Sequence, residues 1–201
     1  LSQIVATALL AMSSCAIPRV SGNYTFDNVQ VNNVARVEDN EDSALISALE
    51  ELERVPDSVQ RIGNNYGCVV LFDGFITEEL EFAHLQGKKH HTGGLWDNIP
   101  GAFNPQTRSA FIRIYLRGQG KSLELHEYGH LIDEALGRIS CQQNFYDIHN
   151  YYKEFLFGLL LDAHSQSNPR EFFADCFVYY YHSDSARNYL KNNFPKAFEF
   201  F

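Results

Sequence analysis

The stretch His126-Glu127-Tyr128-Gly129-His130 lies within a run of apolar residues that repeats at helical spacing. Gly137, a residue typical of helix ends, follows the run, so we expect a buried helix over about residues 121–137. Positions i and i+4 share one face of a helix, so the two histidines can reach the same metal ion. Neutral imidazole nitrogen is a preferred zinc ligand, which makes this helix a candidate zinc site. The alternative is a pair of core histidines that hydrogen-bond to carbonyl groups.

Glu127, the residue after the first histidine, is predicted to act on a water molecule at the metal rather than to bind the metal. It lies about 100° round the helix from its neighbour, and so beside an open coordination position. The third ligand must come from another part of the chain. A third histidine six residues after His130 is excluded, because Leu136 occupies that position.

Glu171 is the candidate third ligand. It begins the sequence Glu171-Phe172-Phe173-Ala174-Asp175, on a helix that we expect to start at Asn168-Pro169. A carboxylate among aromatic residues is costly to bury unless it binds a cation or accepts hydrogen bonds. Asp175 follows one turn later and is predicted to accept the second ring N–H of a ligand histidine, which would orient that ring. The alternative for Glu171 is a carboxylate that the helix dipole stabilises without any metal.

Length and charge limit the class of protein. The chain has 201 residues, which suits one domain, and 45% of them are hydrophobic, enough for a packed core. The 16 basic and 25 acidic residues give a net charge of −9, so nucleic acid and anionic membranes are not expected as partners. No apolar run reaches the roughly 20 residues that a membrane span requires. We expect a monomer.

Strand patterns lie early in the chain and helix patterns lie late, which predicts an α+β fold with a helical second lobe. The expected strands are residues 67–73 and 110–116, with an edge strand or an arm near residues 26–31. Besides the helix of His126, the expected helices are residues 43–52, a short helix from Pro56, and residues 76–86, 146–163, 169–182 and 184–192.

Residues 1–16 combine a short apolar run with small residues, a pattern typical of the end of a secretory signal peptide. An ordinary N-terminal helix is the alternative. Residues 17–42 are polar and acidic, and we expect them to form an N-terminal arm. Secretion into an oxidising compartment would favour a disulfide, for which Cys141 and Cys176 are the predicted pair.

Four segments together resemble the catalytic domain of the anthrax-lethal-factor-like zinc peptidases, a group that includes the Pro-Pro endopeptidases. They are LHEYGHLID at 125–133, EFFADCF at 171–177, IPGAFNPQTRSAFIRI at 99–114 and SDSARNYLKNNFPKAFEFF at 183–201. The resemblance implies a zincin-like fold, with a small twisted mixed sheet and helices in a first lobe, a mostly helical second lobe, and the active-site cleft between them. It implies one catalytic domain over residues 43–201, with lobes at about 43–137 and 138–201.

The same resemblance implies the roles of the site residues. His126, His130 and Glu171 would bind one Zn²⁺ per chain, and Glu127 would be the general base. In the family, a Tyr seven residues before the third ligand donates a hydrogen bond to the reacting carbonyl, and here that position is His164. An imidazole N–H can also donate to an oxyanion, so His164 is the predicted donor. The alternative is a histidine at a helix C-terminus that faces solvent.

We therefore expect a secreted zinc-dependent endopeptidase, whose protein or peptide substrate lies extended along an edge strand within residues 95–116. The alternative is a catalytically impaired zincin-fold toxin or binding module that keeps a structural metal. The intact Glu127 favours the enzyme, whereas the missing Tyr favours the alternative. The loop of Lys88, Lys89, His90 and His91 is interpreted either as a solvated loop tip or as a substrate contact.

Overall fold

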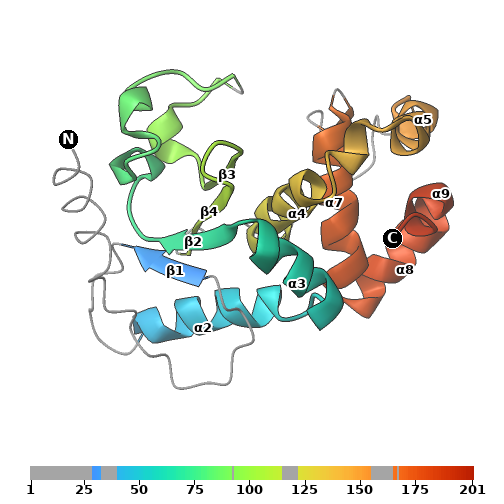
Figure 1. Ribbon diagram of the computed structural model, residues 1–201, viewed down its shortest axis with the longest axis horizontal. Helices are drawn as coiled ribbons and strands as arrows, with labels where there is room; N and C mark the ends of the chain where they lie inside the picture. Colours follow the sequence, from blue (N-terminus) through green and yellow to red (C-terminus); the bar gives the residue numbers. More distant parts are fainter. Residues whose placement is uncertain (1–28, 33–39, 92, 115–121, 155–164, 167) are drawn as a thin grey trace, which may run out of the picture.

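The computed structural model describes residues 29–32, 40–91, 93–114, 122–154, 165–166 and 168–201, and every structural statement below refers to these residues. It confirms the predicted α+β class. A four-stranded sheet and the helices before residue 67 form one part of the molecule, and the later helices lie beside it (Figure 1). None of the described helices is both long enough and apolar enough to cross a membrane.

The sheet is mixed and has the strand order β1-β2-β4-β3. Strands β1 (Val29–Asn32), β2 (Cys68–Phe72) and β4 (Ser109–Arg113) run parallel, whereas β3 (Gly101–Asn104) pairs antiparallel with β4. β1 and β3 are the two edges, so the strand expected near residues 26–31 is an edge strand. The sequence pattern does not predict β3, because this strand has only four residues and begins with a glycine.

The central strands β2 and β4 are buried on both faces, to which their side chains point in alternation. On one face, side chains join the main core beneath the helices: Val69, Leu71, Ala110 and Ile112. On the other face, side chains pack against the segment that follows β2: Val70, Phe72 and Phe111 contact Ile76 and Phe82. The sheet therefore separates the helices from the segment of residues 75–100 that leads into β3.

Three helices agree closely with the expected ranges: α2 (Asn40–Leu52), α3 (Asp57–Tyr66) and α4 (Leu123–Ala135). Ser122 begins α4, since its hydroxyl accepts a hydrogen bond from the backbone N–H of Leu125 at 3.2 Å. α4 contacts α2, α3, β3 and β4, and it also packs against α7 of the C-terminal part. The helix of the two histidines is thus the central element of the fold.

The C-terminal part consists of α5 (Gln143–Tyr152), α7 (Pro169–Tyr181), α8 (Asp184–Asn193) and α9 (Pro195–Phe198). An aromatic core joins these helices. The ring of Phe145 on α5 lies 5.7 Å from that of Phe172 and 5.3 Å from that of Phe173, both on α7. Burial of each such ring contributes about 1.5–3 kcal/mol, so this cluster fixes α7.

The prediction of a helix over residues 76–86 is wrong. The structure has two single 3-10 turns there, η1 (Ile76–Glu78) and η2 (Ala83–Leu85). The side chain of Glu78 accepts a hydrogen bond from the backbone N–H of Phe75 at 3.2 Å, which closes the first turn on itself. Leu80, which a helix would pack, is 83% exposed instead. The helix expected over 146–163 begins earlier, at Gln143, and α5 ends at Tyr152; the remaining expected residues, 155–163, lie outside the described part of the chain.

The predicted disulfide between Cys141 and Cys176 is not formed, and none of the three described cysteines is in a disulfide. The two side chains have opposite surroundings. Cys176 is fully buried in the main core, whereas Cys141 is exposed, with its Sγ 3.7 Å from the hydroxyl of Ser140. Cys176 therefore behaves as a small core residue.

Two further predictions fall outside the described residues. They are the signal-peptide remnant at 1–16 and the role of His164. Most of the arm at 17–42 also lies outside, apart from β1 and the start of α2. These features stay predictions.

Candidate metal centre and active-site cleft

Helix α4 presents His126 and His130 on one face, as their spacing predicts, and α7 brings Glu171 to the same point. Oε2 of Glu171 lies 3.2 Å from Nε2 of His126 and 3.4 Å from Nε2 of His130. The two imidazole rings are nearly perpendicular, at 88°, with centroids 4.9 Å apart. The structure thus joins three residues that are up to 45 positions apart in the sequence.

Gly129, between the two histidines, allows α7 to approach this closely. A Cβ atom at Gly129 would lie 3.1 Å from Cα of Ala174 and 3.3 Å from Cβ of Phe177 on α7. Contacts to two rigid parts of a neighbouring helix leave little room for a larger residue. The glycine of the motif therefore sets the distance between the helix of the histidines and the helix of the glutamate.

The three side chains fit a tetrahedral metal ion. One possible ligand atom from each of them lies within 4.8 Å of those of the others. Ligand atoms about 2.0–2.1 Å from zinc at tetrahedral angles are about 3.3 Å from one another. The observed separations of 3.2 and 3.4 Å agree with that value, and the donor set of two nitrogens and one oxygen is typical of catalytic zinc.

Charge interactions within the set are strong. Burial lowers the pKa of His126, but hydrogen bonds to the carboxylates of Asp175 and Glu171 outweigh it and raise that pKa to about 10. Burial would raise the pKa of Glu171, but hydrogen bonds from His126 and His130 hold it well below its usual range. The carboxylates therefore create a site for positive charge, which protons or a metal ion can supply.

Asp175 lies where the sequence predicts, behind His126. Its Oδ1 accepts a hydrogen bond from Nδ1 of His126 at 3.1 Å, which leaves Nε2 directed at the metal site. The other carboxylate oxygen accepts a hydrogen bond from the hydroxyl of Ser165. The carbonyl of Ser165 in turn accepts from Nε2 of the buried His149 at 2.9 Å. This series of hydrogen bonds fixes the orientation of the His126 ring. No sequence pattern indicates that Ser165 and His149 take part in it.

Glu127 is buried against the start of β3. Burial raises its pKa, and the nearby charges of His126 and His130 partly offset this effect. The backbone of Gly101 leaves the space for the side chain: a Cβ atom at Gly101 would lie 2.8 Å from Cγ and 3.0 Å from Oε1 of Glu127. Gly101 thus allows the carboxylate to lie between the edge strand and the metal ligands.

We expect Gly101→Ala to lower kcat by roughly 10–100-fold, because a displacement of about 1 Å of a catalytic group has effects of that size. Zinc content should not change, since the three atoms nearest the added methyl group all belong to Glu127. Gly94→Ala is the matched control, because a Cβ atom there would meet no heavy atom within 4 Å. Equal kcat values for the two variants would show that Gly101 does not position Glu127.

The candidate metal site opens into a cleft of about 410 Å³. The cleft is lined by β3 and the residues just before it, and by His126, His130, Glu127 and Glu171. His90 and His91 also line this cleft, so the loop that contains them faces the site. Its lining residues are His90, His91, Ile99, Pro100, Gly101, Ala102, Phe103, Pro105, His126, Glu127, His130, Asn168, Arg170 and Glu171.

Comparison with known proteins gives the same relationship that the motifs suggest. The family model described as "Anthrax toxin lethal factor, N- and C-terminal domain" matches residues 25–201. The chain belongs to this family. Among solved structures, it is similar to the Pro-Pro endopeptidase PPEP-2 from Paenibacillus alvei, with 29% sequence identity and a TM-score of 0.72. The match covers 86% of this chain and 94% of that chain, and it confirms the zincin-like fold. The comparison with curated proteins found no match.

In this member of the lethal factor family, a second set of charges joins α4 to α7 beside the metal site. Arg170, which precedes Glu171, donates from Nη2 to Oε1 of Glu134 at 2.8 Å, and its Nε lies 3.5 Å from Oδ2 of Asp133. Asp133 is fully buried and accepts hydrogen bonds from the backbone and the hydroxyl of Ser140 at 2.8 and 2.7 Å. The sequence analysis missed Arg170, although its position next to a predicted ligand on α7 is a usable signal.

Proposed function

We propose that the chain is a zinc-dependent endopeptidase. The observation that carries the proposal is the spacing of His126, His130 and Glu171 at tetrahedral ligand distances, with Glu127 beside them in an open cleft. A structural zinc site has four protein ligands and is closed, whereas a catalytic site has three and keeps one position open. Membership of the lethal factor family and the likeness to an endopeptidase support peptide-bond hydrolysis.

The proposed mechanism assigns the proton transfers to Glu127. Zinc bound at the site would supply Lewis-acid activation of a water molecule and of the scissile carbonyl. Glu127 takes the proton of the attacking water and then delivers it to the leaving amine. Burial raises the pKa of Glu127, which makes it a better proton acceptor than an exposed carboxylate.

The substrate is proposed to bind as an extended peptide along β3. This strand is a sheet edge, and three of its residues, Gly101, Ala102 and Phe103, line the cleft. An edge strand offers backbone N–H and C=O groups that an added strand can pair with. Pairing at this position would place the peptide next to Glu127, because the side chain of Glu127 occupies the space where a Cβ atom of Gly101 would lie.

His164 is the proposed donor to the oxyanion, on the basis of its sequence position. We expect His164→Ala to lower kcat by roughly 10²–10³, the usual loss for one oxyanion donor, with little change in zinc content. His164→Tyr should restore part of the loss, since a tyrosine occupies this position in the family. A near-normal kcat of His164→Ala would assign the donor role to another residue.

The direct test is incubation of the chain with a denatured protein mixture, followed by identification of new N-termini by mass spectrometry. We expect internal cleavages that a zinc chelator abolishes and that added zinc restores. A chain that binds one zinc and cleaves nothing would instead be the catalytically impaired binding or toxin module. Secretion, a monomeric state and residues 1–16 as a signal remnant are part of the proposal and rest on the sequence alone.

A further inference from the structure

The loop that contains His90 and His91 is a small hairpin with its own hydrogen bonds. The backbone N–H of His90 donates to the carbonyl of Gly94 at 2.7 Å, and that of Gly93 donates back to the carbonyl of His90 at 2.9 Å. The N–H of Trp96 donates to the carbonyl of Lys88, also at 2.9 Å. We call residues 88–91 and 93–96 the cleft hairpin. These backbone hydrogen bonds give the hairpin a defined conformation.

Asp97 ties the cleft hairpin to the rest of the first lobe. Its two carboxylate oxygens accept hydrogen bonds from the hydroxyl of Thr77 and from the backbone N–H of Gly87, both at 2.8 Å. These two bonds lower the pKa of Asp97, so the carboxylate stays ionised and the clamp stays intact at neutral pH. The hairpin therefore has a fixed position from which it can contact a ligand.

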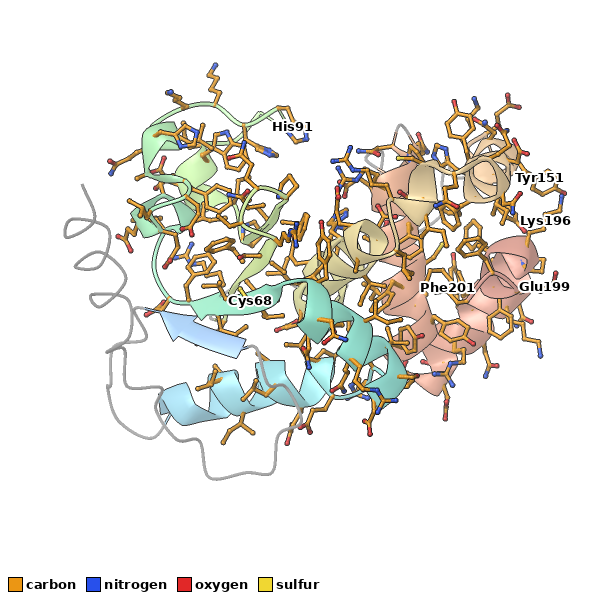
Figure 2. The ribbon with its side chains drawn as sticks, viewed as in Figure 1. Cys68, His91, Tyr151, Lys196, Glu199 and Phe201 are labelled. Atoms are coloured by element: carbon orange, nitrogen blue, oxygen red, sulfur yellow. The ribbon has the colours of Figure 1, made fainter. Side chains whose placement is uncertain are left out.

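Aromatic contacts hold the two imidazoles of the hairpin. The ring of His90 stands edge-on to that of Trp96 at a centroid distance of 4.5 Å, and Trp96 stacks on Phe82 of the core at 6.0 Å. The His91 ring lies 3.8 Å from that of His90. Figure 2 shows His91 at the end of the hairpin that faces the C-terminal helices. Both rings line the same cleft as the metal-binding residues.

The charge of the cleft hairpin differs from that of the chain as a whole. The chain has a net charge of −9, but the hairpin has two exposed lysines, Lys88 and Lys89, next to its two histidines. Arg170 also lines the cleft, but its guanidinium group forms an ion pair with Glu134. Imidazole N–H groups with cations beside them suit a carboxylate, which accepts strong charge-assisted hydrogen bonds.

We propose that His90 and His91 form a carboxylate-binding subsite of the cleft, so that the chain prefers peptides with an acidic group a few residues from the cleaved bond. The inference rests on the proposed peptidase function and adds a substrate class to it. The acidic group is either the side chain of Asp or Glu, or the carboxylate at the C-terminus of a short peptide. Lys88 and Lys89 increase the attraction at longer range but do not line the cleft.

The test uses peptides that differ in one group. A scan replaces each residue around a cleaved bond with Glu or with Gln, and a second pair compares a free C-terminal acid with its amide. We expect kcat/KM to be about tenfold higher for the acidic member at one position, the size expected for one charge-assisted hydrogen bond that is partly exposed to solvent. The pair that shows the difference identifies the source of the carboxylate.

The variant His90→Gln/His91→Gln should reduce this ratio to near one, whereas Lys88→Gln, which keeps both imidazoles, should retain most of it. An unchanged ratio in the double histidine variant, or no preference in the original chain, would overturn the proposal. Binding of the same peptides to Glu127→Gln, measured by fluorescence, separates the two levels of inference. Tighter binding of the acidic peptides to the Glu127→Gln variant would support the carboxylate-binding subsite. Absence of cleavage by the original chain would overturn only the peptidase function.

Discussion

Glu127→Gln should lower kcat by about 10²–10⁴, the usual contribution of a general acid–base group, while one zinc per chain is retained. The amide has nearly the same size as the carboxylate, so it fits the space beside Gly101. It cannot take a proton from the attacking water. The loss should therefore fall on kcat, with little change in KM.

Three measurements make the result specific. Elemental analysis gives the zinc content, thermal unfolding gives the stability, and single-turnover kinetics on one peptide gives the chemical step. Glu50→Gln is the matched control, because it makes the same chemical change at an exposed position of α2. A kcat of Glu127→Gln within a few-fold of that of the control would exclude Glu127 as the base.

The candidate site could be predicted from the sequence because its parts are local. His126 and His130 need only one regular helix to share a face, and the apolar pattern followed by Gly137 indicates where that helix lies and ends. Glu171 and Asp175 are likewise one turn apart on a helix that starts with proline. Within each helix the spacing of the residues determines which side chains share a face, and the predicted bounds of both helices agree with α4 and α7 to within a few residues.

The features that could not be predicted depend on packing between segments distant in the sequence. Gly129 shows its importance only when α7 lies against it, and β3 exists because four residues pair with β4. In the first 3-10 turn after β2, the side chain of Glu78 bonds to the backbone of Phe75 within the turn, and the hydroxyl of Thr77 bonds to Asp97 twenty residues later. The disulfide prediction failed for the same reason, since the pattern of apolar residues does not show that Cys176 faces the core and Cys141 faces solvent.

His126→Ala/His130→Ala should remove zinc from the protein and reduce activity to background, a loss of at least roughly 10³ in kcat/KM. A single carboxylate cannot hold the ion against water, because tight binding of zinc requires three or four protein ligands in tetrahedral positions. His84→Ala is the matched control, since His84 is exposed on η2 and outside the cleft. Zinc content by elemental analysis and cleavage of one peptide are the two measurements.

Glu171→Gln tests the third ligand separately from the two histidines. If Glu171 binds zinc, the neutral amide should weaken zinc affinity by at least about tenfold in a competition with a chromophoric chelator, because a charged oxygen is replaced by a poor ligand. If Glu171 were only a carboxylate that the helix dipole stabilises, the variant would lose a few tenths of a kcal/mol of stability and would bind zinc as before. The convergence of both histidines on one oxygen of Glu171 favours the first outcome, since a dipole contact alone requires no such meeting point.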